Sequence, residues 1–188
     1  MSIPKVLIFD HIAKCGGTSV QNMLMRAGCP ILRLYVRGRE YRNHGGPGPL
    51  LISAHEIFRD LPAQRDEWTF YFTFLRNPLD CFYSQVYASK PEGLSFAETV
   101  DLQLAEGARH VVKKFTLHPS DYDFVGTLED WELSVAKLGK LTGLKLNPNI
   151  REQQSGRPAE RPKEEQLTRV LRGPIALWQD VRATLRGA

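Results

Sequence analysis

The stretch Asp10-His11-Ile12-Ala13-Lys14-Cys15-Gly16-Gly17-Thr18-Ser19 follows a short apolar run at residues 6–9 that is typical of a buried strand. It leads into a helical pattern over residues 20–27, which ends at Gly28. A glycine-containing turn between a strand and a helix presents backbone N–H groups and the positive end of the helix dipole to an anion. Because Lys14 adds a positive charge inside the turn, the stretch predicts a phosphate-binding loop.

This loop differs from the two common nucleotide-binding motifs. A Walker A loop places its lysine after the last glycine, whereas Lys14 precedes Gly16 and Gly17, and the glycine pattern of dinucleotide-binding folds is absent. The hydroxyl groups of Thr18 and Ser19 follow the glycines and could donate to the same anion. The alternative is a plain strand-to-helix turn with a solvated lysine.

The composition is ordinary for a soluble protein. The chain has 188 residues, of which 42% are hydrophobic and 24% charged, with a formal net charge of +4. This length suits a single domain over residues 1–188. The mild positive charge fits an anionic ligand, but basic and aromatic residues do not interleave as on a nucleic-acid surface. We therefore expect no nucleic-acid partner and leave the oligomeric state open.

The cysteines and the apolar segments suggest where the protein resides. The chain has three cysteines, which cannot form a disulfide framework and lack zinc-site spacing. The apolar run near the N-terminus is too short for a signal peptide, and no later segment could span a membrane. We expect a cytoplasmic protein without a membrane partner or a metal ion.

Five apolar runs indicate strands at residues 6–9, 31–36, 50–53, 70–75 and 122–126. Helical patterns lie between or after most of these runs. This alternation favours the α/β class with a mainly parallel central sheet flanked by helices. Ligands of such sheets bind at the carboxyl ends of the strands, where the candidate motifs of this chain also lie.

Helix starts and loops punctuate the second half of the chain. Ser95 begins a capping-box pattern, and residues 127–130 resemble another helix start. Residues 147–163 are rich in polar residues, proline and arginine, which is typical of a loop. Two short helices are predicted to finish the chain, at about residues 163–172 and 174–185.

A second candidate anion site follows the run at residues 70–75. Arg76 emerges at the carboxyl end of this strand, and Asn77 and Pro78 suit the N-cap and first turn of a helix. A guanidinium group there can bind a phosphate through two hydrogen bonds, and the hydroxyl of Ser84, two turns along, could reach the same group. The alternative is that Arg76 pairs with a carboxylate and that Ser84 has no role.

Together the two motifs resemble those of the PAPS-dependent sulfotransferases, in particular the carbohydrate branch that includes heparan sulfate 2-O-sulfotransferase. The order H-x-x-K-x-G-G-T-S, then L-R-N-P and a serine, carries the resemblance, and residues 124–129 resemble the V-G-x-x-E segment of the family. The resemblance implies a P-loop-NTPase-like three-layer fold. It implies that the first motif binds the 5′-phosphosulfate of PAPS and the second its 3′-phosphate. The residues assigned to the nucleotide are Lys14, Cys15, Gly16, Gly17, Thr18, Ser19, Arg76 and Ser84.

Three positions depart from the usual residues of the family. Ala13 stands in place of a proline, Cys15 in place of a threonine and Asn77 in place of an aspartate. None of these changes removes a side chain that the chemistry needs. Cys15 leaves one hydroxyl fewer in the loop, and we expect its thiol to fill space rather than to act as a thiolate.

Sulfuryl transfer requires an activated hydroxyl, an in-line approach to sulfur and stabilisation of the charge on the leaving phosphate. Lys14 is the candidate for stabilising the leaving oxygen, and no metal is required. The resemblance implies that His55, which follows the run at residues 50–53, is the base, since a neutral imidazole is suited to take a proton near pH 7. Glu56 is the alternative base, and a histidine satisfied by a neighbour is the structural alternative for His55.

Further residues receive weaker assignments. We expect His11 to order the loop backbone and Glu129 to fix a loop or a helix start. Two groups of basic residues could contact the acceptor and the nucleotide, respectively, although a solvated basic face is the alternative for the first group. The groups are Arg33, Arg37, Arg39 and Arg42, and Arg151, Arg157, Arg161 and Lys163.

The sequence therefore predicts a sulfotransferase that moves a sulfuryl group from PAPS to a hydroxyl of a carbohydrate or related small molecule and releases PAP. Two other functions stay open at this point: a nucleotide kinase or NTPase of related fold, and a non-catalytic module that binds a nucleotide or a glycan. The position of the lysine and the lack of a clear Mg²⁺-binding acidic residue at a strand end count against the kinase.

Overall fold

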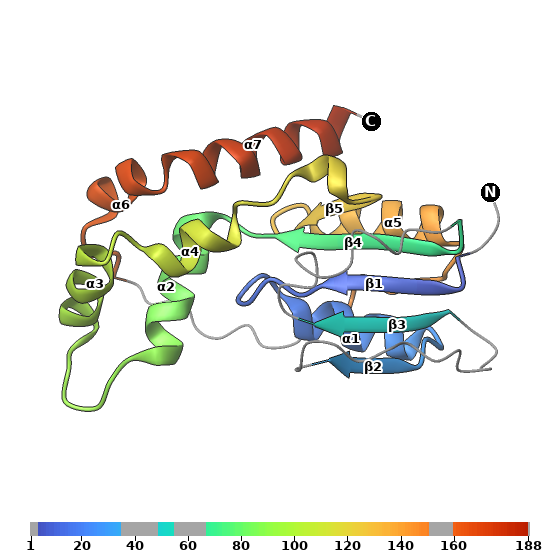
Figure 1. Ribbon diagram of the computed structural model, residues 1–188, viewed down its shortest axis with the longest axis horizontal. Helices are drawn as coiled ribbons and strands as arrows, with labels where there is room; N and C mark the ends of the chain where they lie inside the picture. The colour runs from blue at the N-terminus through green and yellow to red at the C-terminus, as the bar shows by residue number, and fades with distance from the viewer. Residues whose placement is uncertain (1–3, 35–48, 55–66, 151–159, 188) are drawn as a thin grey trace.

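The chain folds around one parallel sheet (Figure 1). The computed structural model describes residues 4–34, 49–54, 67–150 and 160–187. Within them the strands are β1 (Val6–Asp10), β2 (Ile31–Leu34), β3 (Leu50–Ala54), β4 (Thr69–Leu75) and β5 (Phe124–Thr127). Their order is β2-β3-β1-β4-β5, and every neighbouring pair is parallel. The predicted α/β class with a mainly parallel sheet is confirmed.

The central strand β1 is placed where a ligand site is expected. It pairs with β3 on one side and with β4 on the other. From β1 the chain runs to β2 and β3 on one side of the sheet, and from β4 it runs to β5 on the other side. The direction of the chain across the sheet therefore reverses between β1 and β4, and ligands of open α/β sheets bind at the carboxyl ends of strands at such a point.

Two helices, α1 (Gly17–Arg26) and α5 (Trp131–Thr142), pack on one face of this sheet (Figure 1). Successive residues of a strand point to opposite faces, so Leu7 and Phe9 of β1 lie on the same side as Phe72 of β4. These buried side chains form one apolar cluster with residues of both helices. The cluster fixes the helix that starts at the predicted phosphate loop against the strand that precedes it.

A second group of helices lies beyond the carboxyl ends of the strands (Figure 1). It consists of α2 (Pro78–Ser89), α3 (Phe96–Ala105), α4 (Arg109–Lys114) and α6 (Glu164–Val170), and a short 3₁₀ helix (Pro119–Asp121) precedes β5. These four helices share a second apolar cluster.

The last helix, α7 (Arg172–Gly187), runs alongside β5 and connects the two clusters (Figure 1). Trp178 and Val181 belong to the helical cluster, whereas Leu185 belongs to the cluster on the sheet.

The helix ends agree with the sequence signals in most places. The Asn77 side chain accepts a hydrogen bond from the Leu79 N–H at 2.9 Å, and Ser95 forms the predicted capping box. Helix α1 begins at Gly17, three residues before the predicted pattern, because its first turn is made by the loop residues themselves. Helix α4 was not predicted, since six residues are too few to show a helical period.

Candidate nucleotide-binding site

The loop after β1 has a left-handed backbone at two positions. Lys14 has a φ of +68° and Gly16 a φ of +76°. Glycine adopts this conformation without steric cost, and a Cβ at Gly16 would also lie 2.6 Å from Cδ2 of Leu128. Both the backbone angle and the close side chain therefore require glycine at this position. Lys14 holds the same conformation with a side chain, which is uncommon for residues other than glycine, although Ala108 and Lys163 also adopt it.

The second glycine of the loop is required by a different neighbour. A Cβ at Gly17 would lie 1.8 Å from Nε2 of His11. The His11 ring is itself stacked on Phe9, with ring centroids 5.5 Å apart and 13° between the planes. The imidazole is therefore held between β1 and the start of α1, and it supports the loop by packing against it.

The start of α1 offers backbone donors to an anion. The Val20 N–H donates to the carbonyl of Gly16 at 3.2 Å, which is the first hydrogen bond of the helix. The N–H groups of the first helical residues, Gly17 and Thr18, have no carbonyl partner within the helix, and no side chain caps this end. Among the hydroxyl residues here, Thr18 is half-buried and Ser19 is buried. This combination of donors and helix dipole suits a phosphate.

The Arg76 side chain reaches this loop. Its Nη1 donates to the carbonyl oxygen of Lys14 at 3.3 Å. The pairing of β1 with β4, in which Asp10 is opposite Thr73, brings the carboxyl ends of the two strands together. The two predicted anion motifs therefore lie at one site, and within the described parts of the chain Arg76 has no carboxylate partner.

Ser84 lies farther along the same side of α2. It is half-buried and follows Cys81 by three residues, and Cys81 Sγ donates to the carbonyl oxygen of Ala13 at 3.6 Å. Residues three apart share one face of a helix, so Ser84 is one turn beyond the contact between α2 and the loop. Ser84 has no hydrogen bond to the residues that the structure describes.

Cys15 faces another cysteine rather than the loop interior. Both Cys15 and Cys81 are free and fully buried, and their thiols are hydrogen-bonded to each other. This hydrogen bond and burial raise the pKa of Cys15, so its thiol stays protonated. The same hydrogen bond lowers the pKa of Cys81, and nearby cations lower it further. The expected space-filling role of Cys15 agrees with its burial.

One basic residue near this site was missed by sequence reasoning. Lys114, at the end of α4, is one of the cations that lower the pKa of the Cys81 thiol, together with Arg76 and Lys14. Its Nζ donates to Oε1 of Gln85 at 3.3 Å, which holds it against α2. No local pattern marks this lysine, because only the packing of α4 on α2 brings it to the loop.

Two basic residues of the predicted nucleotide-contacting group have acidic partners. Arg161 Nη2 lies 2.6 Å from Oδ1 of Asp80, and its guanidinium is 5.7 Å from the centre of the Tyr83 ring. Lys163 Nζ lies 3.6 Å from Oδ1 of Asp101. These contacts attach the segment before α6 to α2 and α3, and a role of either residue in binding a nucleotide stays a prediction.

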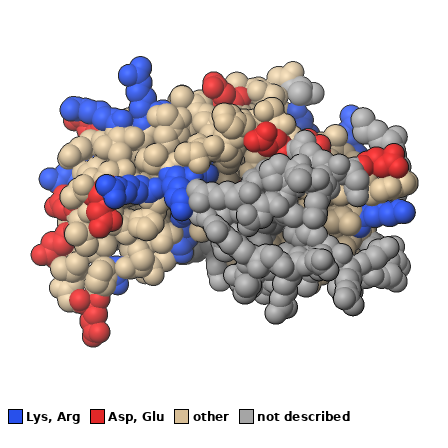
Figure 2. Space-filling model, viewed as in Figure 1, with Lys and Arg blue, Asp and Glu red and all other residues tan. Residues whose placement is uncertain are grey.

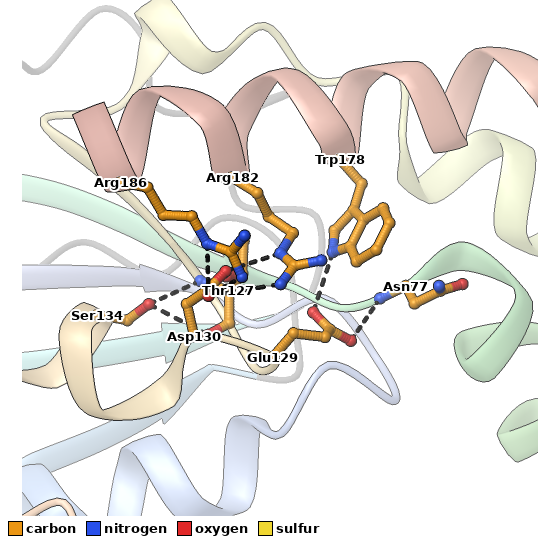
Figure 3. Close-up of polar contacts among 8 residues, drawn as sticks. All are labelled: Asn77, Thr127, Glu129, Asp130, Ser134, Trp178, Arg182 and Arg186. Atoms are coloured by element: carbon orange, nitrogen blue, oxygen red, sulfur yellow. Dashed lines mark hydrogen bonds and ion pairs between the residues drawn. The ribbon is translucent and has the colours of Figure 1, made fainter. Parts of the chain in front are cut away.

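The turn after β5 joins α2 to α7 (Figure 3). Glu129 Oε1 accepts a hydrogen bond from the Asn77 N–H at 2.9 Å, and its Oε2 accepts one from Nε1 of Trp178 at 2.9 Å. Glu129 therefore fixes a helix start, as predicted.

Its neighbour Asp130 is engaged by two arginines of α7 (Figure 3). Arg182 Nε donates to Oδ2 of Asp130 at 2.7 Å, and Arg186 Nη2 donates to Oδ1 at 2.6 Å. The hydrogen bond from Arg182, followed by that from Arg186, lowers the pKa of Asp130 to about 2. These ion pairs join the end of α7 to the start of α5.

Several predicted residues lie outside the described part of the chain. They include the candidate bases, His55 and Glu56, and their roles stay predictions. The same applies to the side chains of the first basic group and to two members of the second, namely Arg33, Arg37, Arg39, Arg42, Arg151 and Arg157.

The surface gives further information on the ligand. Basic side chains gather near the middle of the face in Figure 2, beside the undescribed residues.

Among the residues with described positions, no three His, Cys, Asp or Glu side chains are grouped so as to hold a metal ion. The described helices also include none with the length and apolar character needed to cross a bilayer.

Comparisons with known proteins define the fold. No family model matches the chain, and no curated protein matches it. The crystal structure of a sulfotransferase from Alicyclobacillus acidocaldarius matches with a TM-score of 0.54 and 15% identity, over 99% of this chain and 100% of that chain. The mouse sulfotransferase SULT7A1, complexed with PAP, matches with a TM-score of 0.55 and 15% identity, over 89% of this chain and 62% of that chain. The chain therefore has the P-loop-like fold of these sulfotransferases.

Proposed function

We propose that this protein is a sulfotransferase that moves a sulfuryl group from PAPS to a hydroxyl of a carbohydrate or related small molecule, and releases PAP. The observation that carries the proposal is the contact between the two anion motifs, in which Arg76 Nη1 donates to the Lys14 carbonyl at 3.3 Å. One donor molecule with phosphates at both ends of its ribose needs two such motifs within one site.

The residues of the loop fit the phosphosulfate end of PAPS. The start of α1 has no side-chain cap, so its backbone N–H groups can donate to a phosphate. In the reaction the acceptor oxygen bonds to sulfur while the bond between sulfur and the 5′-phosphate oxygen breaks. Lys14 stabilises the negative charge on that leaving oxygen. The hydroxyl proton passes to a base, for which His55 is our candidate.

The second motif fits the 3′-phosphate. A guanidinium group binds a phosphate through two parallel hydrogen bonds, and Arg76 donates only its Nη1 to the protein among the described residues. Ser84 would contribute a hydroxyl from the face of α2 that contacts the Lys14 loop. The assignment of a carbohydrate acceptor rests on the resemblance of the two motifs to the carbohydrate branch of the family.

The test combines nucleotide binding with transfer. We expect PAP to raise the melting temperature and to bind more tightly than AMP, which lacks the 3′-phosphate. Labelled sulfate should move from PAPS to at least one member of a panel of sugar hydroxyls. Stabilisation by ATP with Mg²⁺ but not by PAP would instead indicate a kinase. Binding of PAP without transfer to any acceptor would indicate a non-catalytic module.

A further inference from the structure

The backbone on either side of Arg76 is held by the segment that follows β5. The Leu128 N–H donates to the carbonyl of Leu75 at 2.9 Å, just before Arg76. The Asn77 N–H, just after it, donates to Oε1 of Glu129 at 2.9 Å. The N–H of Asn77 belongs to the peptide group that links it to Arg76, so the two hydrogen bonds together set the direction in which the Arg76 side chain leaves the backbone.

The same segment touches the first motif. The Leu128 side chain lies against Gly16, where a Cβ would be only 2.6 Å from Cδ2. Residues 128–129 therefore contact the backbone of both anion motifs. A displacement of this segment would move Arg76 relative to the Lys14 loop.

The position of Glu129 depends in turn on α7. Its second carboxylate oxygen, Oε2, accepts a hydrogen bond from Nε1 of Trp178 at 2.9 Å (Figure 3). The Trp178 ring is buried in the helical cluster, and the guanidinium of Arg182 lies 4.8 Å from the centre of that ring. The indole is therefore a fixed donor, which orients a carboxylate that is itself exposed to solvent.

We infer that Glu129 is a positioning residue for Arg76, and that the indole N–H of Trp178 orients Glu129 for this role. The inference rests on the proposed function of Arg76 as the ligand of the 3′-phosphate. It follows that Trp178 of α7 acts on the affinity of the site for the 3′-phosphate through Glu129 and Arg76. A carboxylate is needed because it accepts hydrogen bonds at both oxygens, whereas a glutamine would present an N–H group to one of the two donors.

Two variants test this chain of contacts. Trp178→Phe keeps an aromatic ring but removes the indole N–H together with part of the ring volume, and Glu129→Gln keeps the size of the side chain. The dissociation constants of PAP and AMP are measured for each variant by calorimetry. We expect PAP to bind about 5- to 30-fold more weakly to both variants, with the affinity for AMP changed less than about twofold.

Trp131→Phe is the matched control. Trp131 is also buried, but it lies on α5 and its Nε1 donates to the carbonyl of Pro148 at 2.7 Å. This variant should lower the melting temperature without changing the ratio of the PAP and AMP dissociation constants. That ratio separates a positioning role from a general loss of stability.

Each outcome is decisive. An unchanged ratio in Trp178→Phe and Glu129→Gln, with wild-type selectivity for PAP intact, would overturn the inference and leave the proposed function standing. A wild-type protein without preference for PAP over AMP would overturn the proposed function as well. If Glu129→Gln does not fold, Trp178→Phe alone decides the matter.

Discussion

The carboxyl ends of β1 and β5 both carry charged residues, but they use them in opposite ways. After β5, Asp130 is bonded to two arginines of α7, and Glu129 has hydrogen bonds at both oxygens. After β1, Lys14 has no ion pair with any described carboxylate. Charges that are paired within the protein stabilise the fold, whereas a cation without such a partner remains available to a ligand.

The two regions also differ in the conformation of their backbone. The loop after β1 has two left-handed residues and contains two glycines against which His11 and Leu128 pack. The turn after β5 leads directly into α5 and is tied to α7 by side chains. Loss of Lys14, which has no ion pair among the described residues, should therefore change turnover, whereas loss of the paired Asp130 should change stability.

The largest effect is expected for Lys14→Ala. Loss of the cation at the leaving oxygen should lower kcat roughly 10²- to 10³-fold, as for other groups that stabilise developing charge. The dissociation constant of PAP should change less than about tenfold. Lys113→Ala, on the exposed side of α4, is the control and should keep its activity. A loss of PAP affinity with kcat unchanged would mean that Lys14 binds the ground state and the transition state equally.

Arg76→Ala should have the next largest effect, and on binding. Loss of a charged hydrogen-bonding partner should weaken PAP binding by about 1.5–3 kcal/mol, which is roughly 10- to 150-fold. The preference for PAP over AMP, measured by calorimetry, should disappear. Arg169→Ala removes an arginine from an exposed ion pair on α6 and should leave both affinities unchanged. A retained preference for PAP would show that another residue binds the 3′-phosphate.

Gly17→Ala tests the packing of His11 against the loop. The added methyl group would collide with the His11 ring, and we expect a loss of about 1–3 kcal/mol in the free energy of unfolding, measured by denaturant titration. In a His11→Ala background the cost should shrink, because the colliding ring is gone. Gly173→Ala is the matched control, since nothing lies within 4 Å of the place that its added methyl group would occupy, and the change should stabilise α7 by at most about 1 kcal/mol. Equal costs of Gly17→Ala in both backgrounds would contradict this packing.

The smallest effect is expected for the ion pairs after β5. The pKa of Asp130 is lowered to about 2 in the folded protein, below its usual value. The carboxylate therefore contributes stability that is complete above about pH 4 and is lost as the pH falls toward 2. Asp130→Asn should remove about 1 kcal/mol at pH 7 and flatten this part of the pH dependence, as measured by denaturant unfolding. Glu132→Gln, exposed on α5, should keep the wild-type profile.

Much of the fold could be predicted because its signals are local. All five strands, the capping box at Ser95 and the cap of α2 by Asn77 follow from patterns within a few residues. Helix α4 could not be predicted, because it has only one buried residue and too few turns to show a period. The candidate bases after β3 are not tested by the described residues.

The sequence by itself determined the order of strands and helices and the chemical character of the Lys14 loop, because periodicity, caps and glycine conformations depend on neighbours along the chain. Only the tertiary structure decided which side chains meet: Arg76 with the Lys14 carbonyl, Cys15 with Cys81, and Glu129 with Trp178. These contacts join residues tens of positions apart. They depend on the strand order and on the packing of α2, α4 and α7, which no local pattern encodes.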